Sequence, residues 1–217
     1  MTVWDYLFFS LTGISAHLTF LDYLGWVLVV APILFVTHSI TSNTEGFDQM
    51  LLFRSNSRCE YWVTKLAANA LACIAYSSLL FTIHFCFGLF FFSFETNWGP
   101  LFQTSIQSFH PLIGITFLYV HFTLGIMVIS ILGQTVALFF HHAPFSYIAI
   151  TIYLTISGQL YPYVENSSFL SLLFYPSLQL LLTEEGSLAS LYGTSFFIML
   201  IAIISSFIWI RRQASIL

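Results

Sequence analysis

The chain has 217 residues, of which 58% are hydrophobic and only 6% are charged, with a formal net charge of −4. Soluble domains carry about 25% charged residues, and uncharged runs such as LGWVLVVAPILFV lack the alternation of a transmembrane β-barrel. The composition therefore excludes both classes. It predicts an all-α, polytopic integral membrane protein that forms one transmembrane domain with five to six transmembrane helices.

Five apolar stretches are predicted to cross the membrane, because a span needs about 20 mostly apolar residues. They cover residues 22–41, 64–93, 113–139, 145–161 and 191–210. Residues 4–19 are ambiguous, because this short stretch contains Asp5, Gly13 and His17. It could be a marginal first helix, a re-entrant piece or an interfacial helix.

The basic residues predict the orientation, because Lys and Arg gather on the cytoplasmic side of membrane proteins. Arg211 and Arg212 directly follow the last span, so the C-terminus should be cytoplasmic. Counting the spans back from there places the connector 42–63 in the cytoplasm as well. Every Lys and Arg residue then falls on the inner side of the plasma membrane.

The connector contains two capping-box patterns, S-x-x-E, which start at Ser42 and at Ser57. They predict a short helix at 43–54 and a second helix that runs into the membrane. On the short helix, the residues at spacings of three and four are Phe47, Met50, Leu51 and Arg54. On the second helix, the predicted interfacial anchor consists of Arg58, Tyr61, Trp62 and Lys65, because aromatic rings and long cationic side chains suit the headgroup level.

This order of a span, a short capped helix, the segment RSNSRCEYWVTK and a further span resembles a known family over residues 20–95. The likeness is to the membrane subunits of ATP-binding cassette (ABC) transporters of the type 2 exporter class, in particular to small bacterial permeases. The resemblance implies that 43–54 is a coupling helix whose Phe47, Met50, Leu51 and Arg54 meet a separate ATPase subunit. The chain departs from the family in lacking a basic amphipathic N-terminal helix.

The same resemblance implies the other components of such a transporter. ATP and Mg would bind the partner subunit, since this chain has no G-x-x-x-x-G-K-[ST] motif and is not itself expected to be an enzyme. A second membrane subunit, either an identical or a related chain, would complete the path. Short external helices are expected at 165–190. The expected cargo is a peptide, such as an antimicrobial peptide, or another amphipathic compound.

Two other functions remain open from the residues alone. A non-transport sensor or assembly protein would share the same composition. His84 and His121 lie in neighbouring spans and could hold haem, although hydrogen bonds to neighbouring helices are the commoner role of such residues. We predict packing roles for both, with no catalytic residue, no metal ligand and no nucleic-acid partner.

Overall fold

The computed structural model describes residues 1–11, 20–41, 57–99, 110–140, 148, 150, 152 and 188–214. Over these residues the chain forms five α-helices and no named strand, which confirms the all-α prediction for this part of the chain. The helices are α1 (Val3–Leu11), α2 (Phe20–Thr41), α4 (Arg58–Phe91), α5 (Pro111–Phe140) and α9 (Leu188–Ala214).

Two of these helices, α4 and α5, are long and apolar enough to cross a membrane. With 34 residues at 1.5 Å per residue, α4 is about 51 Å long, whereas the hydrocarbon core is about 30 Å thick. Helices α2 and α9 lie over the predicted spans 22–41 and 191–210, and α9 contains the shorter apolar helix Phe196–Arg211. The count of five to six spans stays a prediction.

Three predicted segments lie wholly or almost wholly outside the described residues. They are the coupling helix 43–54, the span 145–161 and the external helices 165–190. Of the ambiguous stretch 4–19, the structure describes the part that belongs to α1. The nine residues of α1 would extend only about 14 Å, so this helix alone is too short to cross the hydrocarbon core.

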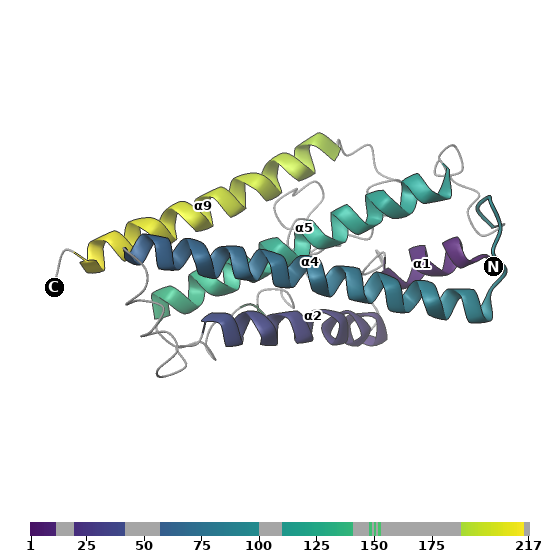
Figure 1. Cartoon of the computed structure of the whole chain (residues 1–217), viewed down its shortest axis with the longest axis horizontal. Coiled ribbons are helices and arrows are strands. Elements are labelled where there is room, and N and C mark those ends of the chain that lie inside the picture. Colours follow the sequence, from purple (N-terminus) through teal and green to yellow (C-terminus); the bar gives the residue numbers. More distant parts are fainter. Residues whose placement is uncertain are drawn as a thin grey trace.

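The helices lie side by side along the long axis of the molecule, with α5 in contact with each of the other four. Figure 1 shows the C-terminus at the end of the bundle where α4 begins, and the N-terminus at the opposite end. The basic residues Arg58 and Arg211 are therefore found at one end, which is called the basic end below.

The long helix α4 exposes apolar side chains and buries polar ones. Leu71 and Phe90 are 67% and 85% exposed, whereas Asn69 and Ser77 are both 0% exposed. A soluble protein normally places residues of these types the other way round. The distribution fits a helix whose outer face meets lipid, and it agrees with the predicted membrane location.

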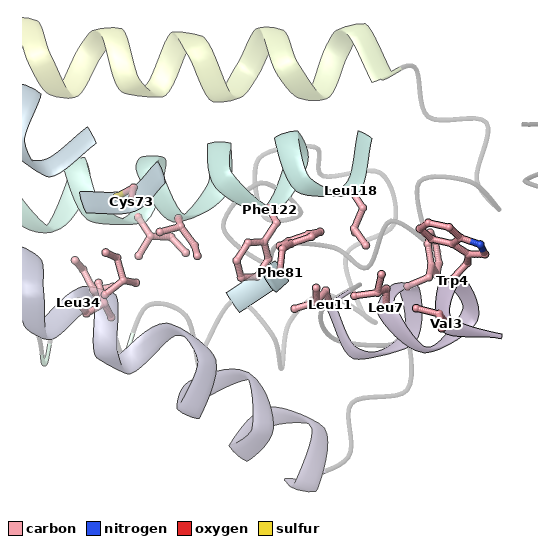
Figure 2. Close-up of a cluster of buried hydrophobic side chains, with 14 residues drawn as sticks. Val3, Trp4, Leu7, Leu11, Leu34, Cys73, Phe81, Leu118 and Phe122 are labelled. Atoms are coloured by element: carbon pink, nitrogen blue, oxygen red, sulfur yellow. The ribbon is translucent and has the colours of Figure 1, made fainter. Parts of the chain in front are cut away.

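The hydrophobic core joins α1 to the two long helices. Val3, Leu7 and Leu11 recur every four residues and so lie on one face of α1. Figure 2 shows this face close to Leu118 of α5, with Phe81 of α4 further along the cluster. The short N-terminal helix is thus packed into the bundle by its apolar face.

The start of α1 is fixed by a buried carboxylate. The Thr2 backbone N–H donates to Asp5 Oδ2 at 2.9 Å, and the Asp5 N–H donates to Thr2 Oγ1 at 3.3 Å, which is a reciprocal cap. Gly99 follows α4 in the chain, and its N–H donates to Asp5 Oδ1 at 3.0 Å. Asp5 is 0% exposed, so its charge is stabilised by these donors and not by water. We call Thr2, Asp5 and Gly99 the N-terminal clasp.

Further contacts hold α1 against the residues that follow α4. The Val3 N–H donates to the Ser93 carbonyl at 3.1 Å, and the Trp4 indole N–H donates to the Glu95 carbonyl at 2.6 Å. A side chain at Gly88 would meet Val3 Cγ1 at 3.0 Å, so the absence of a side chain there lets α1 approach α4. The N-terminal segment is therefore held at both its backbone and its side chains.

Helix α2 carries Pro32 in its interior. Proline has no N–H and its ring disturbs the preceding turn of a helix. The Tyr76 hydroxyl of α4 donates to the carbonyl of Val29, three residues before the proline. This bond attaches α2 to α4 next to the proline.

Candidate functional site

One face of α4 carries a row of polar or polarisable residues at intervals of four. The row consists of Lys65, Asn69, Cys73 and Ser77, all of them buried. Residues four apart lie above one another on a helix, so these side chains form a continuous inward strip. An inward polar strip on an apolar helix is the most unusual feature of the described fold, because polar groups inside a membrane are costly.

Asn69 is the centre of a network that joins three helices. Ser130 Oγ of α5 lies 2.6 Å from Asn69 Oδ1, and Thr37 Oγ1 of α2 lies 3.1 Å from the same oxygen. The two hydroxyl oxygens are 2.5 Å apart, and Thr37 also reaches the Ile33 carbonyl at 2.8 Å. All three side chains are buried, and their direct contacts connect α2, α4 and α5.

The network has fewer protons than contacts. Each hydroxyl carries one proton, so Thr37 and Ser130 can donate at most two of the four contacts at one time. Turning the Asn69 amide over would let its NH₂ group donate to both hydroxyls. In the orientation observed, Asn69 Nδ2 has no partner among the described residues. In this orientation one amide atom of Asn69 is therefore unsatisfied by the described residues.

Two more buried side chains extend the polar region. The Ser77 hydroxyl and both amide atoms of Gln134 have no hydrogen-bond partner within the described ranges, and both residues are 0% exposed. An unsatisfied buried polar group costs about 1–3 kcal/mol. Several such groups therefore destabilise the closed bundle.

The helical register places these groups in successive layers. The contact between Asn69 and Ser130 fixes α4 against α5, and the two helices run antiparallel, since Phe81 further along α4 packs on Tyr119 earlier in α5. Gln134 and Lys65 are each four residues from that contact, or about 6 Å towards the basic end. Ser77 is eight residues away, or about 12 Å in the other direction. We call Asn69, Cys73, Ser77, Ser130 and Gln134 the polar seam.

A separate polar contact joins α5 to α9. Thr135 Oγ1 lies 3.2 Å from Ser206 Oγ, and both hydroxyls donate to backbone carbonyls one turn earlier in their own helices, Ile131 and Ala202. Small hydroxyl residues commonly join helices in membranes. Because each hydroxyl is satisfied, this contact needs no further ligand.

The start of α4 agrees with the predicted capping box. The Glu60 N–H donates to Ser57 Oγ at 3.1 Å, which confirms Ser57 as the N-cap. Of the predicted interfacial anchor, Arg58 is exposed and Tyr61 is half-buried, whereas Trp62 and Lys65 are buried in the bundle. Lys65 Nζ lies 4.8 Å from the centre of the Tyr61 ring, a cation–π contact. The anchoring role stays a prediction.

The predicted ATPase-coupling residues cannot be placed in the same way. Phe47, Met50, Leu51 and Arg54 lie outside the described residues.

The two membrane histidines occupy different surroundings. His84 Nδ1 lies 2.9 Å from the Leu80 carbonyl of its own helix, and its ring stacks on Tyr6 of α1 at 6.2 Å. His121 is 2% exposed within α5. Within the described part of the chain, no group of three or more His, Cys, Asp or Glu residues is placed to hold a metal ion. The packing roles predicted for both histidines stay a prediction.

The residues of the polar seam were missed by reasoning from motifs. Their signal in the sequence is the four-residue interval of Lys65, Asn69, Cys73 and Ser77 within one predicted span. The partner helices of such a strip cannot be identified from one sequence, because Thr37 and Ser130 are 32 and 61 residues away from Asn69.

Comparison with known proteins gives one match. Residues 5–214 match a family described as a protein of unknown function, DUF2705. The match runs from α1 to the end of α9 and so includes every residue of the polar seam. No curated protein and no solved structure matches the chain.

Proposed function

The chain belongs to the DUF2705 family, whose function is unknown, and we propose that it is the membrane-spanning permease subunit of an ATP-driven exporter. The polar seam is the observation that carries this proposal. Polar side chains inside an apolar bundle are rare, and they mark substrate or ion paths in membrane proteins. A protein that only occupied the membrane would gain more from apolar residues at Asn69 and Gln134.

The distribution of charge supports the placement of an ATPase on one side. Arg58 and Arg211 share the basic end of the bundle, as the positive-inside rule requires of a cytoplasmic surface. The end of α2 at Thr41 and the start of α4 at Arg58 both lie at this end of the bundle (Figure 1), so the connector between them begins and ends there. A cytoplasmic ATPase that binds the connector would therefore act on two neighbouring helices.

The resemblance of the connector to coupling segments supplies the proposed contact. Phe47, Met50, Leu51 and Arg54 would form the surface that meets the ATPase. An arginine can make paired hydrogen bonds with a partner's carboxylate, which gives this contact more specificity than lipid headgroups would.

The described contacts suggest how a movement of the connector would reach the centre of the membrane. Tyr76 attaches α4 to α2 near Val29, and Asn69 attaches α4 to Thr37 of α2 and to Ser130 of α5. ATP binding by the partner would move the connector, and this network would transmit the movement to α5. A second membrane subunit would complete the transport path, and the cargo would be a peptide or another amphipathic compound.

Co-purification tests the proposal. We expect the tagged chain to retain a stoichiometric ATPase subunit in mild detergent, and we expect Leu51→Asp combined with Arg54→Glu to release it and abolish ATP-dependent export. The control is Arg211→Glu, which reverses an exposed charge at the same end of the bundle but outside the connector. This control should retain the ATPase.

Three results would contradict the proposal in different ways. If the double variant retains the ATPase and exports normally, the connector is only a membrane anchor. A Soret band in the purified wild-type chain without an ATPase would favour the haem protein. Neither an ATPase nor haem would favour a sensor or an assembly protein.

A further inference from the structure

We propose that the polar seam opens into a water-filled crevice within the chain's own bundle, and that this crevice admits neutral, amide-bearing molecules. The inference deepens the proposed function, on which it rests for its role in export. The opening itself requires only that the bundle lies in a membrane.

The unsatisfied groups of the seam provide the driving force. Asn69 Nδ2, the Ser77 hydroxyl and both amide atoms of Gln134 lack partners in the described part of the chain, although each residue is 0% exposed. Every one of these groups would gain hydrogen bonds from water if α4 and α5 separated. Burying these groups thus makes the closed bundle less stable, whereas apolar residues at the same positions would make it more stable.

The depth of the seam distinguishes it from a surface feature. The midpoint of α4 falls between residues 74 and 75. Asn69 and Ser77 then lie about 8 Å and 4 Å from the middle of the helix, inside the half-thickness of about 15 Å of the hydrocarbon core. Water at this depth requires a crevice between helices, since lipid would not supply it.

The chemistry of the seam indicates the molecules that it would admit. The lining contains the amides of Asn69 and Gln134, hydroxyls and a thiol, and the charged Lys65 lies beyond Asn69, in the layer of Gln134 at the basic end. Amides donate and accept hydrogen bonds at once, so they match the amide of a peptide bond. Between Asn69 and Ser77, where Cys73 lies, an ion would lose hydration without gaining a counter-charge.

Cys73 provides a natural reporter, because it lies on the seam between Asn69 and Ser77 and is 0% exposed in this closed structure. Thiol reagents react with the thiolate, which forms in water and not in an apolar medium. We would remove Cys59 and Cys86 by substitution with Ser and label the remaining Cys73 in proteoliposomes. The reagents are iodoacetamide, which is neutral and bears an amide, and iodoacetate, which is an anion.

The matched control is Ala75→Cys in a chain without native cysteines. Ala75 is exposed on the outer face of α4, two residues from Cys73 and at the same depth. We expect iodoacetamide to label Cys73 and to spare the cysteine at position 75. We also expect the ratio of iodoacetamide to iodoacetate rates to be higher at Cys73 than for free cysteine in water.

Gln134→Leu tests the driving force. Removing two unsatisfied atoms while keeping a similar volume should favour the closed bundle, so labelling of Cys73 should be lost while the melting temperature rises. Unchanged labelling in this variant would overturn the proposed driving force. Equal labelling at positions 73 and 75, or none at 73 with the ATPase and ATP present, would overturn the crevice itself.

The outcome is separable from that of the exporter proposal. Labelling of Cys73 in a chain that binds no ATPase would support the crevice and reject the exporter. A stoichiometric ATPase with an unreactive Cys73 would support the exporter and reject the crevice. A rate ratio equal to that of free cysteine would reject the preference for neutral, amide-bearing molecules.

Discussion

Gly99→Ala should be one of the most damaging small substitutions in the chain. The added Cβ would lie 1.9 Å from Asp5 Oδ2 and 2.9 Å from Asp5 Cγ, so the carboxylate would have to leave its position. It would then lose the Gly99 N–H donor at 3.0 Å and the Thr2 N–H donor at 2.9 Å. Hydrogen bonds to a charged group contribute about 1.5–3 kcal/mol each, so the expected loss is about 3–6 kcal/mol.

The loss should be visible in thermal unfolding followed by circular dichroism in mild detergent. For a chain of this size, about 1 kcal/mol corresponds to about 2–4 °C, so the melting temperature should fall by about 6–24 °C. Gly193→Ala is the matched control, because a Cβ there meets nothing within 4 Å in the interior of α9. Alanine is favoured over glycine in a helix by about 1 kcal/mol, so the control should be neutral or stabilising.

A double variant isolates the proposed cause. In a chain that already carries Asp5→Ala, there is no carboxylate for the new Cβ to displace. Gly99→Ala should therefore add little further destabilisation to Asp5→Ala, as expected of two residues that act through one contact. If Gly99→Ala has the same melting temperature as the wild type, or if the effects of the two substitutions are additive, the N-terminal clasp does not stabilise the protein as argued.

Three further predictions concern other parts of the chain. In intact cells, an impermeant thiol reagent should label a cysteine at Asn97 and spare one at Ser55; the reverse pattern would invert the topology. Ser57→Ala should destabilise the protein by about 1 kcal/mol in denaturant titration through loss of the α4 cap, and an unchanged midpoint would argue against that cap. Purified protein should show no haem absorbance, and a Soret band of one haem per chain would show that His84 and His121 do more than pack.

Local patterns in the sequence predicted local structure well. The capping box predicted at Ser57 depends on residues three positions apart, and the hydrogen bond from the Glu60 N–H confirms Ser57 as the N-cap. Long apolar runs likewise predicted where helices lie: 113–139 corresponds to α5 at Pro111–Phe140. These features follow from the backbone and its immediate neighbours, so no knowledge of the tertiary structure was needed.

Contacts between distant segments could not be predicted in this way. The ambiguous start of the chain contains Asp5, which reads as an obstacle to membrane insertion until Gly99 is found 94 residues later as its donor. The polar seam similarly depends on Ser130, 61 residues from Asn69. A single sequence shows that a polar residue occurs within a span, but it does not show which helix faces it.

The N-terminal clasp also has a consequence for the order in which the protein is assembled during synthesis. Asp5 leaves the ribosome well before Gly99, since 94 residues separate them. At about 5–20 residues per second, that interval lasts about 5–20 s. During this time the Asp5 carboxylate lacks one of its two buried donors, so α1 must wait at the water-facing surface of the membrane or in the insertion machinery. The first helix to be made therefore reaches its final position only after α2 and α4 have been made.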